Sequence, residues 1–498
     1  MKGYATFFLI AVMSLGLVFL LVTRSRAPHD APAADPEIVE IADGGDGGKS
    51  DAGALANDAA VDAAPPKPAE RPLRVTTLGW ELVAAGVALT AMDGGATGPA
   101  IELAPEATLD AVEARLVRTG TDPVGADVAV LPLPAFVLAY DRLRALDPRI
   151  FAVVGFSRGR EELHAGPGAL MKPPPGADAV KLVALGPTTS ADATARAVGS
   201  ESATMLGLFA LDLLGVTPRG VSLVAPGAPD AKTAPFAAVV RGAVDERKLA
   251  LSTADASHLV PIVLVASFTE QLTKNETKMR DFARAWLDGI DRAGKDAANV
   301  AHRLANKEAL PLAAGVGAAP EDRVLIDRLG QIAPVGLAQQ QSWMGAAAKG
   351  PVTIETLAQR QWTLARASGL TAGAPALLPI DPRIIMAIAP VPPSAPAPDA
   401  ALTADAGAFA ALPTGTTPLV AYRADAASDA AAVVAQIGFL SGVFDRAAFR
   451  VSAKGGEKAA RAIAAAARDR FDLPPSRLAT AAGEPAGAFA VVEVLALP

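Results

Sequence analysis

Residues 262–290, IVLVASFTEQLTKNETKMRDFARAWLDGI, join a continuous apolar run to a long amphipathic segment. The run at 259–266 is typical of a buried strand, and 276–293 predicts a helix because apolar residues recur at i, i+3, i+4 and i+7. That apolar face consists of Met279, Phe282, Ala283, Trp286, Leu287, Ile290 and Ala293. Thr273 and Glu276 fit a capping box at its start. The stretch therefore predicts a strand followed by a surface helix with a solvated charged face.

Similar apolar runs alternate with helical stretches throughout 72–388. The predicted strands cover 73–78, 126–131, 150–155, 180–185, 221–224 and 259–266. Because these runs are continuous rather than alternating, we expect parallel strands covered on both faces. This pattern predicts an α/β domain over 72–388.

The N-terminal region reads as a membrane segment and a tether. Residues 5–22, ATFFLIAVMSLGLVFLLV, are apolar or small, and a membrane helix needs about 17–25 such residues. Thr23-Arg24-Ser25-Arg26 follows in place of a small-residue cleavage site. We expect 1–26 to be a membrane anchor, with a cleaved signal peptide as the alternative. The acidic Ala/Asp/Gly/Pro stretch 27–71 predicts a disordered linker.

A second linker and a small unit complete the chain. Residues 389–416 are rich in Ala and Pro, which is typical of a semi-rigid linker. Residues 417–498 predict an α/β unit. Its expected strands are 418–422, 449–453 and 489–497, and its expected helices are 426–439 and 457–470.

Composition excludes several classes of protein. The 498 residues carry a net charge of −7 with no basic stripe, so we expect no nucleic-acid partner. Cysteine is absent, which rules out disulfides, thiol nucleophiles and Cys-based zinc sites. The four histidines lack metal-binding spacing. We therefore predict no metal and no cofactor.

The segment Gly155-Phe156-Ser157-Arg158-Gly159 fits G-x-S-x-G, the nucleophile elbow of serine hydrolases. An elbow needs a long helix after the serine, but Gly166-Pro167-Gly168 restricts that helix to 160–165. A lipase-type HGGG segment is absent, and no histidine stands out as the base. A serine hydrolase is thus a minor alternative, and we predict that the protein is not an enzyme.

Three segments together resemble the periplasmic solute-binding proteins of nitrate/sulfonate/taurine ABC transporters. They are LRVTTLGWE at 73–81, LGLFALDLLGVTPRGVSLV at 206–224, and the stretch 262–290 with its F-A-R-A-W-L-D-G-I helix. The resemblance implies an α/β fold of type II, with two lobes in 72–388 that close on a cleft. It also implies a small solute, expected to be anionic, and an ABC permease or a sensor as partner.

The same resemblance suggests ligand-binding residues. Gly79 and Trp80 follow the first strand at its carboxyl end, where α/β sheets bind ligands. Ser157 would lie at the first crossing between the lobes, where a plain turn is the alternative. Ser200 and Ser202 begin a helix whose N-terminus could hold the solute or could simply be capped. For Trp80 the alternative is core packing.

Residues 417–498 resemble an OmpA-like peptidoglycan-binding domain. The matching segments are EKAARA at 457–462, FDLPPSRL at 471–478, AGEP at 482–485 and VVEV at 491–494. Arg461 matches the ligand-binding arginine of that family, but SAKGG at 452–456 replaces its G-H-T-D loop. Peptidoglycan binding therefore depends on Arg461 alone, and a structural module is the alternative.

These features combine into one hypothesis with two alternatives. We expect a protein anchored in the inner membrane and facing the periplasm, which captures a small solute for a transporter or sensor. The first alternative is an envelope scaffold or cell-wall-anchoring protein with a vestigial cleft. The second is the serine hydrolase.

Overall fold

The structure, a computed structural model, describes residues 71–90, 98–174, 179–184, 200–241, 247–307, 310–344, 352–373, 375–389, 409, 412 and 415–497. The predicted anchor, the acidic linker up to residue 70 and most of the Ala/Pro linker lie outside these ranges. Within the described ranges, no helix has the length and apolar character needed to cross a membrane.

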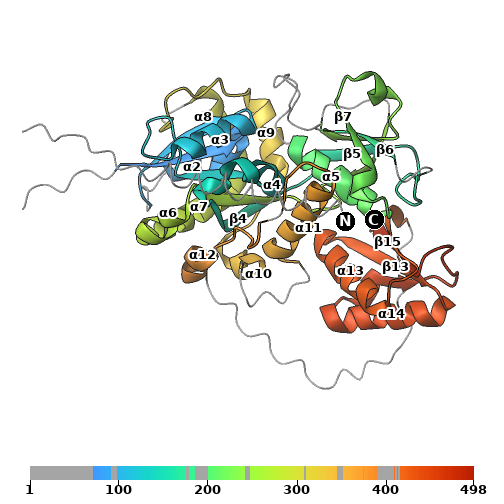
Figure 1. Cartoon of the computed structure of the whole chain (residues 1–498). Helices are drawn as coiled ribbons and strands as arrows, with labels where there is room; N and C mark the ends of the chain where they lie inside the picture. The colour runs from blue at the N-terminus through green and yellow to red at the C-terminus, as the bar shows by residue number, and fades with distance from the viewer. Residues whose placement is uncertain are drawn as a thin grey trace, which may run out of the picture. The chain divides into compact units, whose positions relative to one another are not determined.

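The first sheet has six strands and defines what we call lobe one (Figure 1). Its strands in spatial order are β11 (Ile332–Pro334), β4 (Arg149–Ser157), β10 (Pro261–Ala266), β3 (Val128–Pro132), β1 (Leu73–Leu78) and β2 (Ile101–Glu106). β1 is parallel to β2 and β3, whereas β10 is antiparallel to both β3 and β4. The sheet is therefore mixed, and the expectation of parallel strands alone is wrong.

The second sheet has five strands and defines lobe two (Figure 1). Its strands in spatial order are β7 (Val221–Val224), β6 (Val180–Val183), β8 (Phe236–Val240), β5 (Glu161–Ala165) and β9 (Lys248–Ser252). Helix α5 (Ser200–Leu213) packs against β8 and β5. The chain leaves the first sheet between β4 and β5 and returns between β9 and β10. The predicted α/β class is thus confirmed, with two sheets joined by two crossings.

Helix α7 (Glu276–Lys295) presents the apolar face that its periodicity predicts. Met279, Phe282 and Trp286 are fully buried there. α7 packs along α2 (Ala84–Thr90). The other helices of lobe one are α3 (Leu109–Arg118), α4 (Leu133–Leu143), α6 (Thr269–Lys274), α8 (Ala297–Asn306), α9 (Asp322–Gly330), α10 (Gln340–Met344), α11 (Ile354–Ala367) and α12 (Arg383–Ile388).

Short 3-10 turns connect several of these elements. They are η1 (Trp80–Val83), η2 (Arg144–Leu146), η4 (Pro218–Gly220), η5 (Pro229–Lys232), η6 (Leu337–Gln339) and η7 (Pro475–Arg477). The turn η1 directly follows β1, so it begins at the strand end where the sequence predicted ligand contacts.

The C-terminal module, residues 415–497, has a four-stranded sheet and two helices (Figure 1). The sheet order is β12 (Thr417–Ala424), β15 (Ala490–Ala496), β13 (Ala447–Ala453) and β14 (Leu478–Thr480). Helices α13 (Ala430–Val443) and α14 (Gly456–Phe471) pack against each other, and both contact β13. The predicted strands and helices are present here, together with the unpredicted β14.

The C-terminal module contacts the second crossing and lobe two. The backbone N–H of His258 donates to Val443 O at 3.1 Å, and His258 Nδ1 lies 2.8 Å from Gly442 O. Phe209 of α5 meets Phe439 and Phe444, with ring centroids 6.2 and 6.3 Å apart. The end of α13 is therefore joined to a segment that links the two lobes.

Two local predictions at helix ends are wrong. Residues 160–165, expected as a short helix, form β5, since the chain continues into the second sheet. The capping box of Thr273 and Glu276 does not form because Thr273 lies inside α6 and donates to Glu270 O at 3.1 Å. Asn275 precedes α7 instead, without a side-chain cap.

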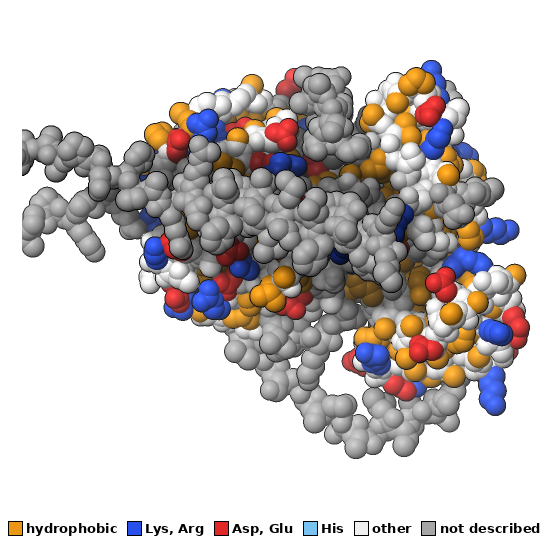
Figure 2. Space-filling view, in the orientation of Figure 1, with side chains coloured by type: hydrophobic (Ala, Val, Ile, Leu, Met, Phe, Trp, Pro, Cys, Tyr) orange, Lys and Arg blue, Asp and Glu red, His pale blue; other side chains and the backbone are white. Residues whose placement is uncertain are grey.

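The described surface mixes charge signs. On the face in Figure 2, Lys and Arg side chains are interspersed with Asp, Glu and hydrophobic side chains over the described residues. This face therefore offers no broad area of a single charge among those residues.

The contact between α2 and α7 yields a test with a control on the same helix. A Cβ on Gly289 would lie 2.5 Å from Ala85 O, so Gly289→Ala must push α7 away from α2. We expect it to lower the free energy of unfolding by about 1–3 kcal/mol. Gly294→Ala meets nothing within 4 Å and should add roughly 0.5–1 kcal/mol through helix propensity. Urea denaturation measures both, and equal effects would contradict this packing.

Candidate functional site

The candidate site is the junction where the two crossings run side by side. Ser157 N donates to Val260 O at 2.9 Å, and Thr253 N donates to Glu161 O at 3.0 Å. Gly159 has φ of 80°, a conformation that favours glycine, and its N–H donates to Thr253 Oγ1 at 2.9 Å. These bonds tie the outgoing strand to the returning one, so the junction is built from residues far apart in sequence.

Glu161 lies at the centre of the junction and is fully buried. Its Oε2 accepts hydrogen bonds from Ser157 Oγ and, at 3.0 Å, from Thr253 Oγ1. Its Oε1 has no hydrogen-bond partner. Burial raises the pKa of Glu161 above its ordinary value, although Arg160 and the two hydroxyls act in the opposite direction. The carboxyl group is thus biased toward its neutral form.

A buried ion pair crosses from lobe one to the first crossing. Arg160 Nη1 donates to Glu81 Oε1 at 2.6 Å, and the Glu81 side chain is fully buried. Arg328 Nη1 on α9 lies 3.6 Å from Glu81 Oε2. Burial lowers the pKa of Arg160, but the charges of Glu81, Glu161 and Glu201 outweigh it and raise that pKa overall. Arg160 therefore stays charged and holds the lobes together through Glu81.

Gly79 makes room for this ion pair. Its φ is 108°, and a Cβ at this position would lie 2.7 Å from Glu81 Oε1. Any side chain here would be strained and would displace the carboxylate that binds Arg160. The predicted importance of Gly79 thus has a physical basis in the backbone, which is distinct from direct contact with a solute.

The first turn of α5 supplies lobe two's side of the junction. Ser200 Oγ and Ser202 Oγ are buried and have no hydrogen-bond partner, and Ser202 is fully buried. Between them, Glu201 is buried, and its charge acts on Arg160. Two hydroxyls without partners therefore lie at a helix N-terminus next to the interlobe charges.

The other predicted binding residues lie elsewhere. Trp80 is 6% exposed, packs within the core of lobe one and has Lys307 Nζ 5.8 Å from its ring centroid. Arg461 is exposed on α14 and donates to Glu457 Oε1 at 2.6 Å. The structure thus brings Gly79, Ser157 and the start of α5 to one junction. The binding roles of all these residues remain predictions.

The surroundings of Ser157 bear on the hydrolase alternative. Its hydroxyl donates to a carboxylate and has no printed contact with a histidine among the described residues. His164 is held by Glu162 and Arg247 O, and His258 by Gly442 O. Ser157 therefore serves as a donor that orients Glu161.

Sequence reasoning missed the charged members of the junction: Glu81, Arg160, Glu161 and Arg328. A signal was present for three of them, since Glu81 follows Gly79-Trp80 and Arg160-Glu161 follows the G-x-S-x-G segment. Charged residues directly at strand ends were candidates for the cleft. Nothing local marks Arg328, which reaches Glu81 from a helix distant in sequence.

Comparison with solved structures returns periplasmic binding proteins. A putative periplasmic sulfonate-binding protein from Methylobacillus flagellatus is 12% identical over 64% of this chain and 93% of its own, with a TM-score of 0.42. The aliphatic sulphonate-binding protein of Escherichia coli is 14% identical over 63% and 91%, with a TM-score of 0.39. A zinc-bound ligand-binding component of an ABC-type import system from Staphylococcus aureus is 13% identical over 64% and 99%, with a TM-score of 0.40.

No protein family model matches the sequence, and no curated protein matches it. Identities and TM-scores this low assign neither a solute nor a family to this chain. The function proposed below therefore depends on the geometry of the junction.

The raised pKa of Glu161 predicts a pH dependence of stability. Its stabilising contribution is complete below the ordinary glutamate pKa of about 4.3 and is lost as pH rises through the folded value. Glu161→Gln keeps acceptors for Ser157 and Thr253 but cannot ionise. We expect its melting temperature to gain on the wild type as pH rises from 4 to 8.

The exposed Glu355 offers a control, because Glu355→Gln should follow the wild-type pH profile. Thermal denaturation at a series of pH values makes the comparison. A constant difference between Glu161→Gln and the wild type across this range would show that Glu161 titrates normally.

Proposed function

We infer that residues 72–388 form a solute-binding domain, which holds a small polar solute between its two lobes. The carrying observation is the set of buried polar atoms without partners at the junction: Ser200 Oγ, Ser202 Oγ and Glu161 Oε1. Buried polar groups in proteins are nearly always hydrogen-bonded, and leaving one unmade costs about 1–3 kcal/mol. A bound solute would supply the partners that the chain does not.

The charges at the junction narrow the chemistry of that solute. Arg160 is committed to Glu81, and Glu201 adds a second carboxylate beside it. The expected anion would meet these carboxylates, and neither arginine at Glu81 is free of a carboxylate. A neutral or cationic solute that donates hydrogen bonds fits this set of residues better than an anion does.

Solute entry requires the lobes to separate and close. Further ion pairs join them: Arg360 of α11 binds Asp212 of α5, and Arg241 lies 3.9 Å from Asp327. The second pair is exposed on both sides and contributes little. A solute favours closure only by the difference between its affinities for the closed and open states.

The wider setting of this function follows from the sequence predictions. We propose that the N-terminal segment anchors the protein to the inner membrane, that the solute-binding domain faces the periplasm, and that an ABC permease or a sensor receives the solute. A cell-wall contact through Arg461 belongs to the same proposal. Retention of the chain on peptidoglycan, lost in Arg461→Ala, would test that contact.

A solute panel tests the main proposal. Amino acids, polyols, amines and small anions are titrated against the full chain while its melting temperature is recorded. One of the hydrogen-bond-donating solutes should stabilise the chain, by about 2.7 kcal/mol at a concentration of 100 Kd. A panel that leaves the melting temperature unchanged throughout would count against solute binding at the junction.

A pair of serine variants locates the site. Ser202→Ala removes a buried hydroxyl without a partner, so it should leave the free protein equally stable or slightly stabilise it, and it should weaken solute binding about tenfold. Ser441→Ala removes a buried hydroxyl that donates to Gly438 O at 2.7 Å. This control should cost about 1 kcal/mol and leave solute affinity unchanged. The reverse pattern would place the solute elsewhere.

A further inference from the structure

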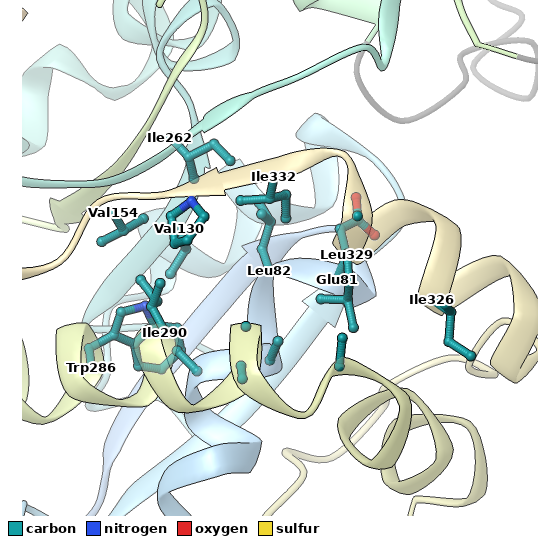
Figure 3. A pocket seen from close by; sticks show the side chains of 17 residues that line it. Glu81, Leu82, Val130, Val154, Ile262, Trp286, Ile290, Ile326, Leu329 and Ile332 are labelled. Carbon is teal, nitrogen blue, oxygen red and sulfur yellow. The ribbon is translucent and has the colours of Figure 1, made fainter. Parts of the chain in front are cut away.

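Lobe one contains a cavity of about 400 Å³, which is separate from the buried hydroxyls of lobe two (Figure 3). It lies between the strands of the first sheet and helices α2, α7 and α9. Pockets that hold small molecules typically measure about 300–1,000 Å³. The cavity is therefore large enough for a ligand.

The walls of this cavity are almost entirely apolar. The strands contribute Val130, Val154 and Ile262, while α7 and α9 contribute Ile290 and Leu329. Protein interiors are normally packed as densely as organic crystals, and a void of this size forfeits many contacts. An apolar molecule would restore those contacts.

Two polar groups break the apolar lining, and each is incompletely satisfied. Trp286 is fully buried, and its Nε1–H has no hydrogen-bond acceptor. Glu81 Oε2 has no hydrogen-bond donor, and Arg328 Nη1 is 3.6 Å away. In Figure 3, the indole of Trp286 lies at one end of the cavity and the carboxylate of Glu81 at the other.

These groups specify the polar ends of an occupant. A carboxylate in an apolar wall attracts a protonated amine and repels an anion. An indole N–H donates only, so it requires an acceptor such as a hydroxyl or ether oxygen. The complementary molecule has an apolar body, an ammonium group near Glu81 and an acceptor near Trp286.

The cavity reaches the surface beside α9. Ile326, which lines it, is 44% exposed, and Figure 3 shows this residue at the outer end beyond Glu81. Ala297 at the start of α8 also lines the cavity and is half-buried. A narrow molecule therefore has a route of entry that does not require the lobes to separate.

We propose that this cavity is a binding site for an apolar primary amine that carries a hydrogen-bond acceptor at its far end. Glu81 belongs to both sites, since Oε1 accepts from Arg160 and Oε2 faces the cavity. An ammonium group in the cavity competes with Arg160 for this carboxylate. Occupancy of lobe one thereby loosens the ion pair that holds the lobes together.

Four probes of equal chain length test the proposal by isothermal titration calorimetry on the full chain: 8-amino-1-octanol, octylamine, 1-octanol and octanoate. We expect affinity to fall in this order, with octanoate at least tenfold weaker than octylamine. Trp286→Phe should remove the advantage of 8-amino-1-octanol over octylamine, a factor of about three to ten. Glu81→Gln should remove the advantage of octylamine over octanol.

A variant at the cavity mouth separates binding from general stickiness. Ala297→Phe should fill the entrance and weaken every probe at least tenfold, whereas Ala298→Phe places the same ring at an exposed neighbour that does not line the cavity. Equal affinity for octylamine and octanoate, or no binding of any probe, would overturn the proposal. Unchanged binding in Ala297→Phe would do the same. If amine binding fails while the solute panel still stabilises the chain, only this site is lost, and the junction stands.

Discussion

The contact between Arg160 and Glu81 is the interaction on which the arrangement of the lobes depends. Taking both charges out of water costs several kcal/mol per ion, so the pair is tolerable only while its partners stay together. Gly79 leaves space for the carboxylate, and Arg328 approaches its second oxygen. Thr253 and Glu161 align the two crossings beside it. The strongest charge pairing of the junction is therefore also the point at which the lobes separate.

This pairing explains why binding and lobe movement would be linked. Interlobe closure satisfies Glu81 Oε1, yet it leaves polar atoms of α5 and Glu161 without partners. A molecule that satisfies those atoms stabilises closure, whereas one that draws on Glu81 from lobe one opposes it. The two effects act through a single carboxylate, which gives the coupling a definite chemical origin. The C-terminal module touches the second crossing through His258, so it lies where it would sense the same movement.

Much of the framework was predictable because apolar runs bounded by polar residues mark strands directly. β1 and β7 have the bounds expected from sequence, and α7 presents the expected apolar face. Strand direction is not encoded in such runs, so antiparallel β10 was missed. β5 was missed because its sequence, EELHA, is polar, although Glu161 turns inward toward Ser157 and Thr253. The junction and the cavity combine side chains from distant segments, and no local pattern records such meetings.

The central claim is that a buried ion pair holds the two lobes together, and a double-mutant cycle tests it most directly. The free energy of unfolding is measured for the wild type, Glu81→Gln, Arg160→Met and the double variant. The account predicts that each single variant loses about 3–5 kcal/mol and that the double variant recovers part of the loss, with a coupling energy of about 1–3 kcal/mol. Losses that add within about 0.5 kcal/mol would show that the two charges do not interact, which would contradict the account.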